Sequence, residues 1–189
     1  MQKVGLLGGT FDPPHYGHLM IAEEVLEALD LDEVWFIPSN EPPHKEKSDT
    51  KVEYRVEMLQ AAIEDNTNFK VNQIELKRSG KSYTVDTIKL LREQYPEITF
   101  YFIIGADMVE YLPNWYKIDE LSKLVQFVGV KRSDYQLKSN YPVVQVNIPG
   151  VDISSTLIRE RLSEGKSIRY FLPESVIDVI KEHQIYGSK

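Results

Sequence analysis

The chain has 189 residues with a formal net charge of −7 and no cysteine; this length predicts a single domain over 1–189 whose core needs no disulfide or metal. The acidic balance excludes a non-specific nucleic-acid binder, which needs a basic face, and the lack of cysteine excludes disulfides, thiolate nucleophiles and Cys-bound zinc. No stretch approaches about 18 consecutive apolar residues and the N-terminal apolar run is too short for a signal peptide, so we expect no membrane span and a cytoplasmic location.

Apolar runs rich in β-branched and aromatic residues alternate with segments of helical periodicity. Several runs are continuous, as in strands that are covered on both faces. The predicted elements in chain order are strand Val4–Leu7, a helix from near Tyr16, strand Val34–Ile37, helix Val56–Ile63, strand Phe69–Leu76, helix Val85–Leu91, strands Ile98–Ile104, Val125–Val130 and Val143–Ile148, and helices Ser155–Ser163 and Pro173–His183. This alternation predicts an α/β fold with a Rossmann-like, doubly wound, mostly parallel sheet. The polar, proline-bearing segment Pro38–Thr50 is typical of a functional loop.

A glycine-rich turn joins the first strand to the first helix. Gly8 and Gly9 let the backbone approach a ligand with no Cβ in the way. In an open α/β sheet this turn lies at the carboxyl end of the strands, where ligands bind, and the helix that follows offers N–H groups to an anion. His15 and His18 stand three residues apart at that helix start, so both can face one phosphate.

Other interpretations of this turn are weaker. It lacks the third glycine of a dinucleotide GxGxxG motif and the GK[ST] of a Walker loop. The His15–His18 pair has no further ligands to complete a zinc set. A structural role stays open for each histidine, and Asp12 and His183 are interpreted as structural or surface residues.

The segment GGTFDPPHYGH resembles the GxFxPxHxGH motif of the HxGH nucleotidyltransferases, which transfer a nucleoside monophosphate from a triphosphate. The resemblance implies two catalytic histidines, His15 and His18. It also implies that the ATP-binding residues here are Gly8, Gly9, Thr10 and Phe11.

A second cluster of phosphate-binding residue types lies near the C-terminus. The segment from Ile153 to Arg159 is typical of a helix start, with Ser154 or Asp152 as the N-cap. By itself it could be an ordinary capped amphipathic helix. It resembles the second nucleotide motif of the same family, ISSTxIR, which implies that the β- and γ-phosphates of ATP are held by Ser155, Thr156 and Arg159.

Three further stretches resemble one branch of the family, the nicotinate mononucleotide adenylyltransferases: PSNEPPHK from Pro38, SYTVDT from Ser82, and IGADM…LPNW from Ile104. The resemblance implies that Lys45 and Thr10 hold phosphate oxygens and that Gly105 and Asp107 meet the adenosine ribose. It also implies that Trp115 stacks on the pyridine ring and that backbone amides of Thr84 and Tyr116 face the pyridine carboxylate. Three of these residues have simpler alternative roles: Trp115 could fill the core, Thr84 could cap a helix, and Lys45 could be a solvated surface charge. Arg132, which follows a predicted strand, is a further candidate for phosphate contact.

The implied reaction transfers the adenylyl group of ATP to nicotinate mononucleotide, yielding deamido-NAD and pyrophosphate, with Mg²⁺ bound to ATP and no protein metal ligand. Alternatives are a pantetheine-phosphate adenylyltransferase, a glycerol-phosphate cytidylyltransferase, or a non-catalytic nucleotide sensor on the same fold. The residues do not distinguish an acid from an amide acceptor. The sequence does not reveal the oligomeric state, for which a homodimer is the commonest outcome.

Overall fold

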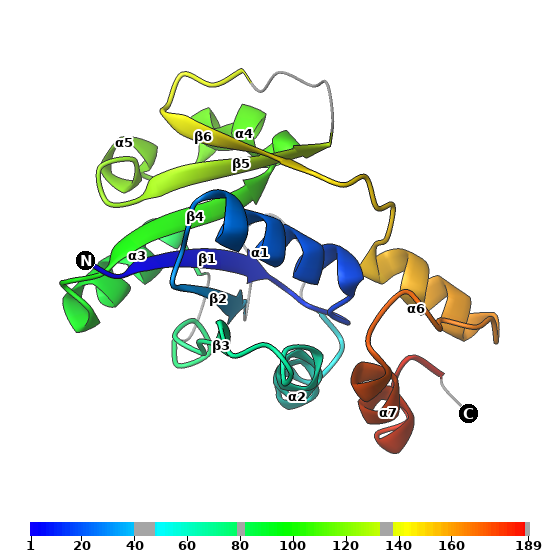
Figure 1. Cartoon of the computed structure of the whole chain (residues 1–189). Coiled ribbons are helices and arrows are strands. Elements are labelled where there is room, and N and C mark those ends of the chain that lie inside the picture. Colours follow the sequence, from blue (N-terminus) through cyan, green and yellow to red (C-terminus); the bar gives the residue numbers. More distant parts are fainter. Residues whose placement is uncertain (40–47, 79–81, 133–137, 188–189) are drawn as a thin grey trace.

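The computed structural model describes residues 1–39, 48–78, 82–132 and 138–187. Six strands form one sheet in the order β3-β2-β1-β4-β5-β6, and every neighbouring pair is parallel (Figure 1). The strands are β1 Lys3–Gly9, β2 Glu33–Pro38, β3 Phe69–Val71, β4 Thr99–Gly105, β5 Gln126–Arg132 and β6 Val143–Ile148. The helices are α1 Tyr16–Ala28, α2 Val52–Ala62, α3 Thr84–Gln94, α4 Ala106–Tyr111, α5 Ile118–Leu121, α6 Ser155–Ser163 and α7 Glu174–Glu182, with 3-10 turns η1 Leu112–Asn114 and η2 Ile185–Gly187. None of the described helices is long and apolar enough to cross a membrane.

The predicted fold class and the order of the long elements are confirmed. The prediction of a strand over Phe69–Leu76 is wrong beyond Val71, where β3 ends. The Asn72 side chain accepts a hydrogen bond from the backbone N–H of Ile74 at 3.0 Å, and this turn takes the chain out of the sheet. The helices α4 and α5 were not predicted, because four to six residues are too few to show a helical period.

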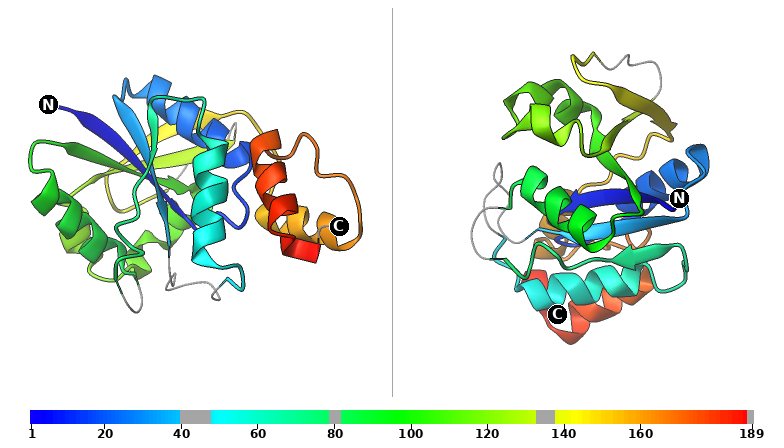
Figure 2. Two further views of the ribbon diagram at one scale, coloured as in Figure 1. Left: turned by 90° about the horizontal axis from the view of Figure 1, so that it is seen from below. Right: turned by 90° about the vertical axis from the view of Figure 1, so that its left-hand side faces the viewer.

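Apolar side chains fill both faces of the sheet, as continuous strand hydrophobicity requires. On β2, Val34 and Phe36 belong to one buried cluster while Trp35 and Ile37 belong to the other. The first cluster is covered by α1, α2, α6 and α7, and the second by α3, α4 and α5. Figure 2 shows α1 and α3 on opposite sides of the strands.

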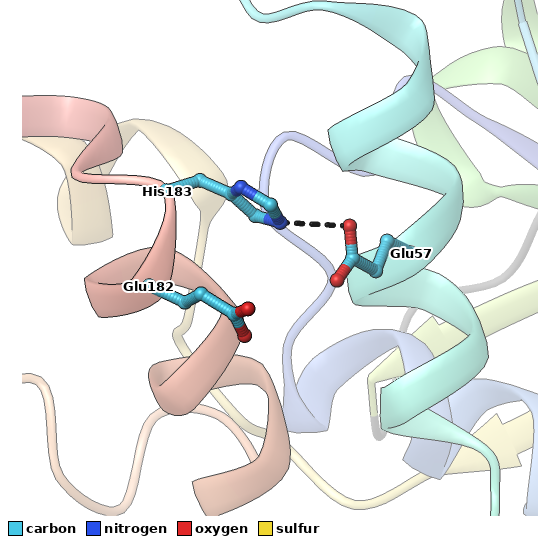
Figure 3. A group of neighbouring side chains, drawn as sticks. All are labelled: Glu57, Glu182 and His183. Atoms are coloured by element: carbon cyan, nitrogen blue, oxygen red, sulfur yellow. Dashed lines mark hydrogen bonds and ion pairs between the residues drawn. The ribbon is translucent and has the colours of Figure 1, made fainter.

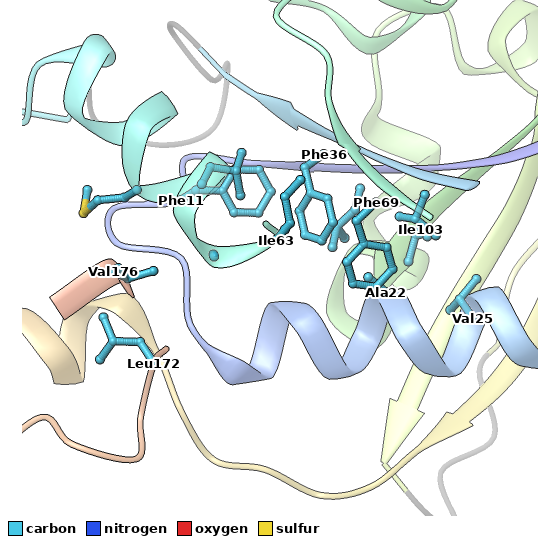
Figure 4. Close-up of a cluster of buried hydrophobic side chains, with 14 of the residues drawn as sticks. Phe11, Ala22, Val25, Phe36, Ile63, Phe69, Ile103, Leu172 and Val176 are labelled. Carbon is cyan, nitrogen blue, oxygen red and sulfur yellow. The ribbon is translucent and has the colours of Figure 1, made fainter. Parts of the chain in front are cut away.

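The first cluster reaches the carboxyl end of β1. Phe11, two residues after the last glycine of that strand, is 2% exposed and packs against Phe36 with ring centroids 5.7 Å apart (Figure 4). Leu172 and Val176, from the C-terminal part of the chain, lie in the same cluster. The glycine-rich turn is therefore seated on the core, and the C-terminal helices pack beside it.

The strand order also determines where a ligand can bind. The chain builds β1, β2 and β3 outward in one direction and then returns to add β4 on the other side of β1. The helix after β1 covers one face and the helix after β4 covers the other. This reversal point, at the carboxyl ends of β1 and β4, is where ligands bind in open α/β sheets.

Candidate active site

A cavity of about 1060 Å³ opens at the carboxyl end of β1. Its walls come from the glycine-rich turn, the start of α1, the segment 148–153, the start of α6, the residues around the start of α2, and η2. Among the predicted site residues, the cavity is lined by Gly8, Gly9, Thr10, Phe11, His15, His18, Ser155, Thr156 and Arg159. Residues that are about 140 positions apart in sequence thus share one space of a size that holds a nucleotide.

Direct hydrogen bonds join the two motifs. The Ser155 hydroxyl donates to the Pro13 carbonyl at 2.8 Å. The Arg159 guanidinium donates from Nη1 to the Asp12 carbonyl at 2.7 Å and from Nη2 to the Thr156 hydroxyl at 3.3 Å. The start of α6 is therefore fixed against the loop that leads into α1.

The two histidines are held by each other and by the helix start. Their rings stack with centroids 3.8 Å apart and an interplanar angle of 28°. The backbone N–H of His15 donates to Nδ1 of His18 at 3.2 Å. Because Nδ1 accepts, neutral His18 carries its proton on Nε2, which is then the donor nitrogen. Phe11 meets the His18 ring edge-on, with centroids 5.0 Å apart.

Burial sets the charge state of His15. Its side chain is 6% exposed, and this burial lowers its pKa to about 4, so the imidazole is neutral near pH 7. Its Nδ1 is buried without a hydrogen-bond partner in the described part of the chain. A Cβ at Gly17 would lie 3.0 Å from both Cε1 and Nδ1 of this ring, so the glycine gives the imidazole its place.

The two helix starts differ in how they use their backbone donors. The Tyr16 N–H, in the first turn of α1, donates to the Phe171 carbonyl at 3.0 Å and is therefore taken by the protein. Among the N–H groups at the start of α1, this one is therefore not available to an anion. At α6 the predicted cap is confirmed, since the Ser154 hydroxyl accepts from the Leu157 N–H at 3.1 Å.

Four residues at or next to the cavity wall were not predicted as site residues: Asp12, Ser48 and Tyr186 line the cavity, and Arg55 contacts the lining residue Thr10. Asp12 is 8% exposed, and its carboxylate accepts hydrogen bonds from the Ser48 hydroxyl at 2.7 Å and from the Tyr186 hydroxyl. Arg55 is 2% exposed and donates to the Thr10 carbonyl at 2.7 Å. Burial lowers the pKa of Arg55, and the neighbouring Asp12 charge opposes that shift. Arg55 precedes the predicted helix Val56–Ile63, and Asp12 occupies a variable position of the first motif, so neither residue carries a signal in the sequence.

Five described residues that were predicted for the acceptor or the ribose do not line this cavity: Thr84, Gly105, Asp107, Trp115 and Tyr116. Thr84 begins α3, and Tyr83 rather than Thr84 is the N-cap, so the capping alternative for Thr84 is wrong. The Tyr83 ring contacts the Tyr116 ring with centroids 4.6 Å apart, which brings the two predicted amide positions into one neighbourhood. At the end of β4, a Cβ on Gly105 would lie 2.8 Å from Oδ1 of Asp107, so the carboxylate folds back over that glycine.

Trp115 combines core packing with partial exposure. Its ring meets Phe102 and Phe127 edge-on, with centroids 5.9 and 6.3 Å apart. Its Nε1 is buried and has no hydrogen-bond partner among the described residues. Lys45 lies outside the described residues, and Arg132 ends β5 with its side chain outside the described part.

One group of potential cation ligands lies apart from the cavity lining. Glu57, Glu182 and His183 place one ligand atom each within 4.8 Å of one another, between α2 and α7 (Figure 3). His183 Nε2 lies 2.8 Å from a Glu57 carboxylate oxygen, and its ring stacks on Tyr54 with centroids 4.3 Å apart. These two contacts attach the end of α7 to α2, and this structural role explains why the His183 and Glu57 side chains lie together.

The geometry agrees with the relationships of the chain to known proteins. A family profile described as "Cytidylyltransferase-like" matches residues 6–161, so the chain belongs to that class of nucleotidyltransferases. A "Nicotinate-nucleotide adenylyltransferase" of Bacillus subtilis is 49% identical over 189 residues, covering all of both chains. A "Probable nicotinate-nucleotide adenylyltransferase" of Oceanobacillus iheyensis is 57% identical over 187 residues, covering 99% of this chain and 98% of the relative. Within its class, the chain therefore belongs to the nicotinate-nucleotide adenylyltransferases.

A solved structure shares the fold. The nicotinic acid mononucleotide adenylyltransferase of Plasmodium falciparum, complexed with NaAD, superposes with a TM-score of 0.83. The two chains are 21% identical, and the match covers all of this chain and 99% of the other.

Proposed function

We propose that this chain transfers the adenylyl group of ATP to nicotinate mononucleotide, releasing pyrophosphate and forming deamido-NAD. The proposal rests on family membership and on one observation above others. The histidine pair and the Ser155–Arg159 cluster line the same cavity and are joined through the Asp12 and Pro13 carbonyls. A triphosphate is the ligand that needs both groups of donors at once.

The reaction needs positioning and charge stabilisation rather than an activated side chain. The 5′-phosphate of the acceptor is already a nucleophile; an oxygen of it attacks the α-phosphorus of ATP, and the bond to the bridging oxygen of pyrophosphate breaks. We assign His18 Nε2–H to the α-phosphate oxygens and neutral His15 to the neighbouring oxygens. Ser155, Thr156 and Arg159 hold the departing pyrophosphate.

Mg²⁺ fits this site as a partner of the phosphates rather than of the protein. Both carboxylate oxygens of Asp12, the buried acid of the cavity, already accept hydrogen bonds from Ser48 and Tyr186. Bound with ATP, the ion supplies shielding of the triphosphate charge.

The remaining assignments are extensions of the same proposal. We assign Lys45 to phosphate, Gly105 and Asp107 to the ribose, and Trp115 to the pyridine ring. A cytoplasmic location is supported by the lack of cysteine. We also predict that the protein forms a homodimer, which sedimentation analysis can test.

A pyrophosphate-release assay tests the function. Wild-type protein with ATP should turn over nicotinate mononucleotide in preference to nicotinamide mononucleotide, phosphopantetheine or glycerol phosphate. His18→Ala should lower kcat by about 10²–10³ with the fold intact, the usual effect of losing one transition-state donor. Pyrophosphate release with only a different acceptor, or no pyrophosphate release with any acceptor, would count against the assignment.

A further inference from the structure

The Asp12 carboxylate is a junction between the phosphate loop and two distant segments. Asp12 stands three residues before His15, is 8% exposed, and lies in the wall of the cavity. One carboxylate oxygen accepts from the Ser48 hydroxyl at 2.7 Å and the other accepts from the Tyr186 hydroxyl. Burying a carboxylate costs free energy unless hydrogen bonds compensate for the lost water, and this one also lies beside a proposed site for anions. Its two hydrogen bonds therefore indicate a role in fixing the loop.

Tyr186 reaches this carboxylate from the C-terminal turn η2, 174 positions away in sequence. The turn is held in place by α7, which is attached to α2 through the His183–Glu57 contact. Burial and the hydrogen bond to Asp12 both raise the pKa of Tyr186, so its hydroxyl keeps the proton that it donates. Tyr186 is itself part of the cavity wall.

We propose that Tyr186 is a positioning residue for adenylyl transfer: through the Asp12 carboxylate, its hydroxyl orients the loop that carries His15 and His18. This inference rests on the proposed function. The Tyr186 hydroxyl holds the loop at Asp12. Three residues later the loop reaches the start of α1, where the backbone N–H of His15 donates to Nδ1 of His18. Without this hydrogen bond only the Ser48 hydroxyl, among the described residues, holds the Asp12 carboxylate, so the loop that leads to both imidazoles is less firmly oriented.

The fold itself does not depend on the hydroxyl. Arg55 still holds the Thr10 carbonyl, Arg159 the Asp12 carbonyl, and Ser155 the Pro13 carbonyl. Removing only the hydroxyl, in Tyr186→Phe, therefore leaves a folded protein whose histidines are less well oriented. We expect kcat to fall about tenfold while the KM for ATP changes less than about threefold, because misorientation affects the transition state more than ground-state binding.

The test compares Tyr186→Phe with Tyr170→Phe, the same change at a tyrosine that is 83% exposed and outside this cavity. Wild-type turnover establishes the function first; if it is absent, the fault lies with the proposed function. The second readout needs no activity: the imidazole ¹⁵N signals of His18 should shift in Tyr186→Phe and not in Tyr170→Phe. Unshifted signals, or an active wild type with an unchanged kcat in Tyr186→Phe, would overturn the proposal.

A double-mutant cycle shows whether the effect passes through the carboxylate. In an Asp12→Ala background, adding Tyr186→Phe should lower kcat by less than about twofold, because the acceptor is already gone. A full tenfold further loss would mean that Tyr186 acts elsewhere. If Asp12→Ala does not fold, Ser48→Ala replaces it: the double variant with Tyr186→Phe should then lose more than the product of the single losses, and simple multiplication would refute the shared carboxylate.

Discussion

Replacing Gly17 by alanine should damage the site although it adds only one methyl group. The new Cβ would lie 3.0 Å from two atoms of the His15 ring, whereas ordinary contact begins at 3.4 Å. The ring must therefore retreat by at least about 0.4 Å. Moving the His15 ring costs free energy, because the side chain is only 6% exposed and the ring stacks on His18 with centroids 3.8 Å apart.

The two consequences can be measured separately. Overpacking costs about 1–3 kcal/mol, and alanine returns about 1 kcal/mol of helix propensity. We expect a net loss of about 1 kcal/mol, seen as a Tm lower by about 2–4 °C. Because a misplacement of about 1 Å can cost about 10²-fold in rate, kcat for pyrophosphate release should fall between about ten- and a hundredfold.

Gly150→Ala is the matched control, since a Cβ there meets nothing within 4 Å. It should leave kcat and Tm unchanged. The reasoning is refuted if Gly17→Ala raises the Tm as an unhindered helical substitution would and keeps the wild-type kcat. A fall in kcat of the same size in Gly150→Ala would show that the contact with His15 is not the cause.

Three further outcomes follow from the structure. Burial raises the pKa of Glu75 to about 7 from an ordinary 4.5, so between these pH values the folded state binds a proton that the unfolded state has lost. The free energy of unfolding should therefore fall by up to about 3 kcal/mol as the pH rises from 4.5 to 7, and urea unfolding should show this slope in the wild type but not in Glu75→Gln. Burial lowers the pKa of His15 to about 4, so its contribution to stability is lost as the pH falls from 6.5 towards 4, and an imidazole ¹⁵N titration with a midpoint near 6.5 would contradict the burial. Ser154→Ala removes the N-cap of α6 and should lower stability by about 1 kcal/mol, or 2–4 °C in Tm, measured by calorimetry; an unchanged Tm would mean that water replaces the cap.

Much of the fold could be predicted from the sequence because the strands are long, apolar and regularly spaced. The failures have local causes: Asn72 ends β3 through its own side chain, and α4 and α5 are too short to show a period. The cavity lining at the two helix starts was predictable, because its residues are concentrated in two short motifs. The Tyr186 hydroxyl was not, because its partner is 174 residues away and nothing in the local sequence records that contact.

The loop between β1 and α1 owes its suitability for an anion to the direction of its carbonyl groups. A carbonyl oxygen that faced the phosphates would repel them, so each must find a donor elsewhere in the protein. The Thr10 carbonyl accepts from Arg55 of α2, and the Asp12 and Pro13 carbonyls accept from Arg159 and Ser155 of α6. These elements draw the loop's acceptors into the protein, and two of those donors also line the cavity. The strand–turn–helix motif that the sequence displays so clearly therefore does not satisfy these carbonyl oxygens by itself: it needs α2 and α6 packed against it to supply their donors.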